Sequence, residues 1–328
     1  MRLTRRSALA ALGGVSAITI VGRAEAQNVI LRSAEVHPDG YPTIVGVNDM
    51  SRRLQERTNG RYRIQVFHSG QLGGERDTID QTRFGVIDMN RINMAPFNNL
   101  IPETNVPSLP FMFRDIPHMR KVMDGPIGES ILAKFEPHGL VALAFYDSGA
   151  RSMYNRTKPI NTVADMRGMK IRVQQSDMFV ALIQALGANP TPMPYGEVFT
   201  SLQTGVIDGA ENNWPSYESS RHFEVARYFS QTEHSNSPEV LVMSKRRFDS
   251  MTPADREIVR ASAKESVAAM RESWDARERA SEELVKSRGV QVNTVDKSSF
   301  VQATQSVVER FASTPELRQL VERIRAVT

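Results

Sequence analysis

The sequence predicts an α/β protein built as two lobes with a cleft between them. Near the start of the chain, strand-like and helix-like stretches alternate, which is typical of a mostly parallel sheet covered by helices. The tetrapeptide Gly-Val-Ile-Asp occurs at 85–88 and again at 205–208, each time after an expected helix and shortly before an Asn, Asn93 or Asn212. We interpret the copies as equivalent strands of two similar lobes, each directing its Asn into the cleft. A chain of 328 residues is long enough for two hydrophobic cores.

The first lobe is expected over residues 27–150. Its elements are predicted from the spacing of apolar residues, which recur at every second position in a strand and at every third or fourth position in a helix. In chain order, the sequence predicts a strand from Val29 to Val36, a helix with Ile44, Val47, Met50 and Leu54 on one face, a strand over 62–66, and a helix that follows the glycine turn at 71–76 and ends near Gly85.

The second lobe is expected over residues 151–239. Ile171 and Val173 alternate with polar residues, which predicts a strand with one apolar face and places Arg172 on the opposite face. A helix with a buried apolar stripe is expected next, closed by Gly187. Three prolines between 190 and 194 then keep the chain extended.

Residues 240–328 are expected to return to the first lobe and complete it. Thr252-Pro253-Ala254-Asp255 resembles a capping box, and a helical pattern continues from about residue 253 to 287 without a breaker. A straight helix of this length extends over about 50 Å, more than the width of one lobe. We therefore expect it to lie across both lobes. A strand near 290–292 and two helices should follow and finish the first lobe.

Residues 1–26 have the pattern of a cleavable export signal. The segment begins with positive charges, continues with a run of small apolar residues over 8–21, and ends at Ala24-Glu25-Ala26, which fits a cleavage site. The apolar run is too short for a membrane anchor. Arg5-Arg6 also permits export by the twin-arginine route. We expect a periplasmic protein.

The composition argues against several classes of function. The first 26 residues hold four Arg and one Glu, so their removal lowers the formal net charge from +4 to +1 and leaves no electrostatic basis for nucleic-acid binding. The chain has no Cys, which excludes disulfides and thiolate metal sites. Its six His residues never stand at the spacing of a helical metal site. We expect a monomer without metal or cofactor.

Two arginines are the principal candidates for binding. Arg172 presents a planar fork of donors that suits a carboxylate, although a solvated surface Arg fits the strand pattern as well. Arg151 follows Ser148-Gly149-Ala150, small residues that let a ligand or another strand approach closely. The alternative for Arg151 is a boundary residue with a solvated head. If both arginines face the cleft, the cleft requires an anion such as a carboxylate.

Segments 165–173 and 192–212 resemble the signature of the solute-binding proteins of tripartite ATP-independent periplasmic (TRAP) transporters. They read D-M-R-G-M-K-I-R-V and P-M-P-Y-G-E-V-F-T-S-L-Q-T-G-V-I-D-G-A-E-N, and the resemblance covers nearly the whole chain after residue 27. It implies the two-lobed periplasmic solute-binding protein fold, with a central ligand cleft and a long helix bracing both lobes. It also implies that Arg172 clamps the carboxylate of an organic acid and that a membrane permease carries out the transport.

The resemblance adds polar and aromatic residues to the expected site. Besides Arg172 and Arg151, it implies ligand contacts by Glu75, Asn93, Tyr195 and Asn212. His37, at the end of the first strand, and Glu211, beside Asn212, are further candidates from their places in the sequence. Glu75 would repel a carboxylate but accept hydrogen bonds from hydroxyls, which favours a polyhydroxylated ligand. Each of these residues also has an ordinary structural alternative, such as a favourable charge in the first helical turn for Glu75.

The ligand class follows from three more segments. Residues 37–42, 98–104 and 211–217 resemble the branch of the family that binds hexuronic acids such as glucuronate and galacturonate. A sugar ring with one carboxylate and several hydroxyls matches two arginines and a set of acid and amide groups. A C4-dicarboxylate or a 2-oxo or hydroxy acid remains an alternative, although it would leave those groups unpaired.

No enzymatic signature is present. The mature part of the chain lacks H-E-x-x-H, G-x-S-x-G, a phosphate loop and a dinucleotide-binding fingerprint. We predict that the chain is not an enzyme. A periplasmic enzyme acting on a sugar acid is the alternative from another class, because a catalytic triad is defined by geometry and can be assembled from scattered residues.

Overall fold

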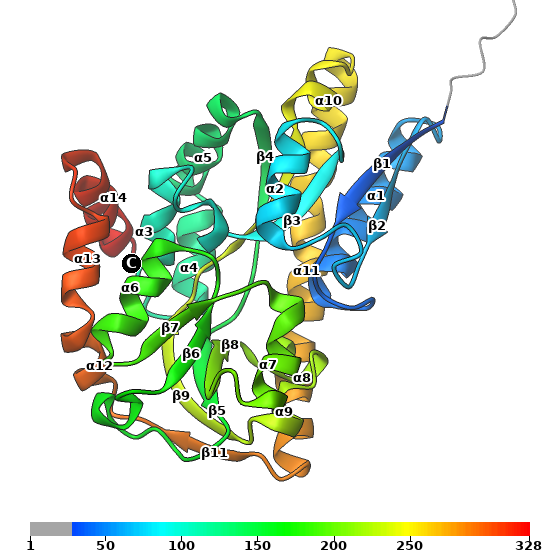
Figure 1. Ribbon diagram of the computed structural model, residues 1–328. Helices are drawn as coiled ribbons and strands as arrows, with labels where there is room; N and C mark the ends of the chain where they lie inside the picture. The colour runs from blue at the N-terminus through cyan, green and yellow to red at the C-terminus, as the bar shows by residue number, and fades with distance from the viewer. Residues whose placement is uncertain (1–27) are drawn as a thin grey trace, which may run out of the picture.

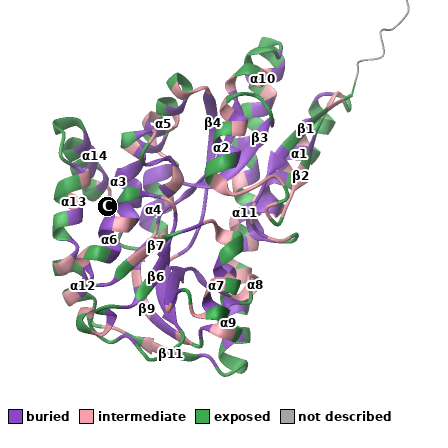
Figure 2. Ribbon diagram, in the orientation of Figure 1, coloured by how far each residue is buried: buried purple, intermediate pink, exposed green. Residues whose placement is uncertain are grey.

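The computed structural model describes residues 28–328, which form two lobes, each built on its own sheet (Figure 1). The predicted export signal at 1–26 lies outside the described residues. Within the described part of the chain, no helix is long and apolar enough to cross a membrane. In Figure 2 the strands of both lobes are largely buried, while the outward faces of the surrounding helices are exposed.

The first lobe contains a five-stranded sheet in the order β2-β1-β3-β10-β4. Its strands are β1 (Val29–Ala34), β2 (Tyr62–Phe67), β3 (Met89–Asn93), β4 (Leu140–Tyr146) and β10 (Glu239–Ser244). The helices of this lobe include α1 (Pro42–Arg57), α2 (Glu75–Arg83), α3 (Asn105–Ser108), α4 (Ile116–Met123), α5 (Pro126–Leu132), the 3-10 helix η3 (Ala133–His138) and α10 (Lys245–Asp249). β1 and β3 run parallel, so their carboxyl ends lie at the same edge of the sheet.

The second lobe contains a six-stranded sheet in the order β11-β9-β5-β8-β6-β7. Its strands are β5 (Arg151–Asn155), β6 (Lys170–Val173), β7 (Asn189–Pro192), β8 (Gly209–Asn212), β9 (Tyr228–Ser235) and β11 (Gln291–Thr294). Its helices include α6 (Asp177–Ala185), α7 (Val198–Thr204), α8 (Trp214–Ser219) and α9 (His222–Val225). The chain crosses between the lobes after β4 and again before β10, close to the expected positions 150 and 240.

The long helix α11 (Pro253–Ser287) lies across both lobes, as predicted. The Thr252 side chain caps its first turn by accepting a hydrogen bond from the Asp255 backbone N–H. The helix packs on α1 and β4 in the first lobe and on α8 in the second. Gly149, in the first crossing segment, has φ +61°, and a Cβ there would lie 3.0 Å from the Trp274 ring. The absence of a side chain at Gly149 therefore lets the long helix approach the crossing segment closely.

The C-terminal segment differs from the expectation that it completes the first lobe. A strand does form after the long helix, but β11 pairs in parallel with β9 at the edge of the second sheet. α12 (Lys297–Ala303) and α13 (Gln305–Phe311) also lie on the second lobe, against β9 and α6. Only α14 (Pro315–Ala326) returns to α3 and α5 of the first lobe. The elements after α11 join the second lobe because this long helix ends at the far end of that lobe.

The repeated tetrapeptide forms the turn before a strand in each lobe, and not the strand that we predicted. Gly85 and Gly205 end their helices with φ +76° and +79°, a left-handed conformation that favours Gly. Asp88 exchanges two hydrogen bonds with the Arg32 backbone of β1. Asp208 makes the equivalent two with the Lys170 backbone of β6. The two turns are therefore equivalent, and the strands that follow them end at Asn93 and Asn212.

Candidate functional site

A small cavity lies where the ends of the strands of the two lobes meet. The empty space between its lining atoms amounts to about 270 Å³, including space that is open to solvent. Seven of the eight predicted contact residues line it, namely His37, Glu75, Asn93, Arg151, Arg172, Tyr195 and Asn212. The eighth, Glu211, lies behind this lining.

Within the described part of the chain, Arg172 is a buried cation without an acidic partner. It is 3% exposed, and among residues 28–328 no carboxylate oxygen lies within 4.0 Å of its guanidinium nitrogens. Its Nε and Nη2 both donate to the Met193 carbonyl, at 3.1 and 2.9 Å, which fixes the plane of the fork. Burial lowers the pKa of Arg172 because the charged form loses its hydration. This side chain therefore supplies the cavity with an uncompensated positive charge.

Arg151, in contrast, is neutralised inside the protein. Its Nε donates to Glu211 Oε2 at 2.5 Å and its Nη2 to Glu211 Oε1 at 2.8 Å, while Nη1 donates to Asn212 Oδ1 at 2.9 Å. Burial raises the pKa of the Glu211 carboxyl, but the Arg151 charge and the nearby His234 outweigh it and lower the pKa to about 2. Glu211 thus holds Arg151 in place, and Arg151 holds the Asn212 amide at the cavity.

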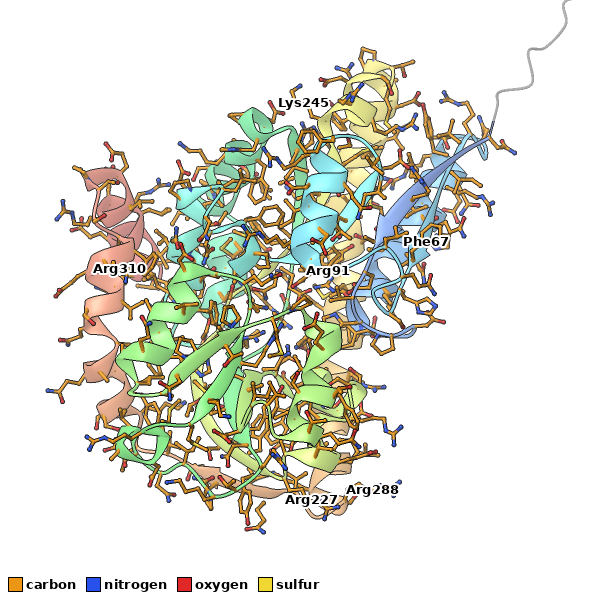
Figure 3. All side chains as sticks on the ribbon, viewed as in Figure 1. Phe67, Arg91, Arg227, Lys245, Arg288 and Arg310 are labelled. Atoms are coloured by element: carbon orange, nitrogen blue, oxygen red, sulfur yellow. The ribbon has the colours of Figure 1, made fainter. Side chains whose placement is uncertain are left out.

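The first lobe contributes a network of carboxylates around Arg91, which is labelled in Figure 3. Arg91 is 1% exposed and donates to Glu35 at 2.7 Å and to Glu239 at 2.8 Å. Its Nη1 lies 3.5 Å from Glu75 Oε1. Three carboxylates thus surround one guanidinium on this side of the cavity, whereas two arginines face one carboxylate on the other side. The cavity is polarised, with its positive end in the second lobe.

Glu75 is held in an environment that disfavours its charge. Burial, followed by the nearby Glu239, raises the pKa of Glu75 from 4.5 to about 7. The Asn93 backbone N–H donates to Glu75 Oε1 at 3.1 Å and partly offsets this effect. At neutral pH the Glu75 carboxyl can therefore either donate or accept a hydrogen bond.

This raised pKa gives a stability prediction. Because the folded-state pKa of Glu75 lies above the ordinary value, ionisation destabilises the folded protein increasingly as the pH rises from about 4.5 to 7. We expect Glu75→Gln to stabilise the chain relative to the parent by roughly 1 to 3 kcal/mol at pH 8 and by much less at pH 4.5. Urea denaturation of both proteins at the two pH values measures this difference, and a pH-independent difference would contradict the assignment.

Hydrogen bonds between the lobes surround the cavity. His37 Nε2 lies 3.2 Å from Ser216 Oγ, and the Tyr41 hydroxyl lies 2.9 Å from the same oxygen. Asn93 Nδ2 donates to Ser148 Oγ at 3.4 Å in the crossing segment. Burial lowers the pKa of His37, so its imidazole is neutral at pH 7. The Tyr195 hydroxyl donates to the Ser216 carbonyl at 3.0 Å, which places its ring beside the cavity.

Sequence reasoning missed Arg91, Gln174, Ser216 and Glu239. Glu239 and Ser216 line the cavity, and Arg91 supports it from behind. The available signal was a polar pattern in two strands that are otherwise apolar, since Arg91 stands beside Ile92 and Glu239 opens the run Val240–Met243. A charged residue inside a buried strand requires a partner, but the sequence does not show which one.

The comparisons with known proteins agree with the fold and the predicted family. The sequence model of the DctP family, bacterial extracellular solute-binding protein family 7, matches residues 33–314. A solute-binding protein of Chromohalobacter salexigens is 40% identical over 97% of this chain and 94% of its own length.

Two solved structures of TRAP periplasmic solute-binding proteins are similar over almost their whole length. The protein of Xanthobacter autotrophicus Py2, with bound β-D-galacturonate, is 53% identical and has a TM-score of 0.90, covering 91% of this chain and 100% of that one. The protein of Roseobacter denitrificans, with bound β-D-glucuronate, is 43% identical with a TM-score of 0.89, covering 92% and 100%. The predicted family and the two-lobed fold are thus confirmed: the chain belongs to the DctP family of bacterial extracellular solute-binding proteins and is a TRAP solute-binding protein.

Proposed function

We propose that this chain captures a hexuronate, such as galacturonate or glucuronate, in the cavity between its lobes. The observation that carries the proposal is Arg172, a buried guanidinium that has no acidic partner among residues 28–328 and needs an anion. In this proposal the uronate carboxylate lies on Arg172, while Arg151 and Asn212 offer further donors. The relatives with bound galacturonate and glucuronate support the same ligand class.

The polarity of the cavity favours one carboxylate over two. The end of the cavity in the first lobe carries Glu75 and Glu239, which accept hydrogen bonds from sugar hydroxyls but repel a second carboxylate. A C4-dicarboxylate would therefore place its second charge against carboxylates. We infer that hydroxyl groups, and not a second acid group, occupy this end.

Ligand entry requires the lobes to separate, because both lobes line the cavity and hydrogen bonds such as His37–Ser216 close it. We propose that the crossing segments near 147–150 and 236–238 act as hinges between the lobes. In this proposal one lobe is built on residues 27–150 and the other on residues 151–239, and the chain after residue 239 contributes elements to both. The loaded protein then delivers the acid unchanged to a membrane permease. In this proposal residues 1–26 direct a monomer to the periplasm and are removed.

A thermal-shift experiment tests the ligand class. We expect galacturonate or glucuronate at 1,000 times its Kd to stabilise the chain by about 4 kcal/mol, and succinate at the same concentration to stabilise it far less. Mass spectrometry of the recovered ligand should find it unchanged. Stabilisation by succinate alone would contradict the uronate proposal, and conversion of the uronate would indicate an enzyme.

A further inference from the structure

A second hollow, the β4 groove, lies along the free edge of β4 in the first lobe. It has about 1580 Å³ of empty space including its open mouth, and none of its lining residues belongs to the uronate cavity. β4 is the last strand of its sheet and runs between α5 with η3 on one side and α11 on the other. The groove therefore has a strand edge as its floor and two helical segments as its walls.

The floor contains backbone groups that have no hydrogen-bond partner in the part of the chain that the structure describes. Residues Val141–Phe145 all line the groove, although they are only 1–7% exposed. In an antiparallel edge strand, alternate residues direct both N–H and C=O away from the neighbouring strand. Within residues 28–328, the backbone of Val141–Phe145 hydrogen-bonds to β10 and to no other segment. Buried backbone groups of this kind require water or another chain as a partner.

The two walls carry opposite charges at helical spacing. On the α5 side, Glu129 and Glu136 flank the small apolar pair Leu132 and Ala133. All four residues line the groove, Glu129 and Leu132 from α5 and Ala133 and Glu136 from η3.

On the α11 side, Arg260, Lys264 and Arg271 flank the apolar residues Val267 and Ala268. Arg260 forms an ion pair with Glu136 of the opposite wall at 3.6 Å, and Arg271 forms one with Asp124, which also lines the groove, at 2.6 Å. Lys264 and Glu129 are exposed and have no ion-pair partner among residues 28–328. Among the described residues of the groove, the unpaired charges are therefore Lys264 on the α11 wall and Glu129 on the α5 wall, on either side of an apolar centre.

We propose that the β4 groove receives an extended segment of a partner protein as an added β-strand. The side chains of a strand point alternately to its two faces, so acidic residues would face α11 and basic residues would face α5. Main-chain hydrogen bonds to β4 supply affinity, and the two charged walls select the segment. The irregular pairing near Leu143, where β4 has an extra residue opposite β10, limits the added strand to a short stretch.

A second copy of this chain does not fit the groove. The β4 edge is recessed between its own helices, so two such edges cannot come into contact. In a two-fold antiparallel pairing, α11 would also meet α11 and the acidic α5 wall would meet its own copy, so like charges would oppose each other. The occupant is therefore a slender segment of a different protein, with acidic and basic residues in alternation.

A designed peptide tests this inference. The probe is a labelled eight-residue peptide in which Lys and Glu alternate around two central Val residues. A block peptide of the same composition, with all Lys before all Glu, and a version with N-methylated backbone serve as comparisons. By fluorescence anisotropy we expect the alternating peptide to bind at least about tenfold more tightly than either comparison.

Variants of the full chain locate the binding. Ala268→Trp fills the groove from an exposed position on α11 and should abolish binding of the alternating peptide. Ala280→Trp makes the same change at an exposed α11 position outside the groove and should leave binding unchanged. Lys264→Glu replaces the unpaired cation of the α11 wall by an anion and should weaken binding about tenfold, while adding Glu129→Lys should restore it. Equal binding of the alternating and block peptides, or no binding at millimolar concentration, would overturn the proposal.

Discussion

Replacing Arg172 by Lys is expected to weaken uronate binding by at least about tenfold, or roughly 1.4 kcal/mol. Lys keeps the positive charge but loses the planar fork that can bind both oxygens of a carboxylate. It also loses the two hydrogen bonds to the Met193 carbonyl that hold the Arg172 side chain in position. Isothermal titration calorimetry with galacturonate and glucuronate measures the change.

Arg167→Lys is the matched control for this prediction. Arg167 precedes the same strand but is exposed and does not line the cavity, so affinity should be unaffected. Circular dichroism and thermal unfolding establish that both variants fold. If Arg172→Lys binds uronate as tightly as the parent, Arg172 does not hold the carboxylate.

Replacing Glu211 by Gln is expected to lower the free energy of unfolding by about 3–5 kcal/mol at pH 7, because it leaves the buried Arg151 guanidinium without its counter-ion. The folded-state pKa of Glu211 is about 2, below the ordinary value of 4.5. Its stabilising contribution is therefore complete above about pH 4.5 and decreases as the pH falls toward 2. The difference between parent and variant should shrink over the same range.

Urea denaturation at a series of pH values measures this effect. Glu197→Gln serves as the control, since Glu197 is exposed in the same lobe and should change stability by no more than about 0.5 kcal/mol. Equal stability of the parent and Glu211→Gln at pH 7 would show that Arg151 does not depend on this carboxylate.

The local patterns of the sequence predicted most of the elements and the residues of the cavity. The alternation around Ile171 and Val173 predicted β6, and the same strand carries Arg172 into the cavity. The repeated tetrapeptide predicted the internal similarity of the lobes. Our prediction that the tetrapeptide itself forms a strand was wrong, because a pattern of four residues does not distinguish the turn at the end of a helix from the strand that follows.

Local sequence patterns do not predict which strands and side chains from distant parts of the chain come together. Arg91 and Glu239 are 148 residues apart, and they meet because β3 and β10 are antiparallel neighbours. The strand near Val292 was predicted, but a short edge strand carries no information about which sheet it joins. Likewise, the sequence showed that Arg151 and Glu211 could both be near the ligand. It did not show that they neutralise each other and leave Arg172 as the uncompensated cation.

The crystal structure of the chain with bound galacturonate tests the central claim most directly. The account predicts both carboxylate oxygens of the ligand within about 3 Å of the Arg172 guanidinium nitrogens. It also predicts ring hydroxyls at Glu75 and Glu239. A carboxylate bound elsewhere, with the Arg172 fork contacting only the Met193 carbonyl, would contradict the account.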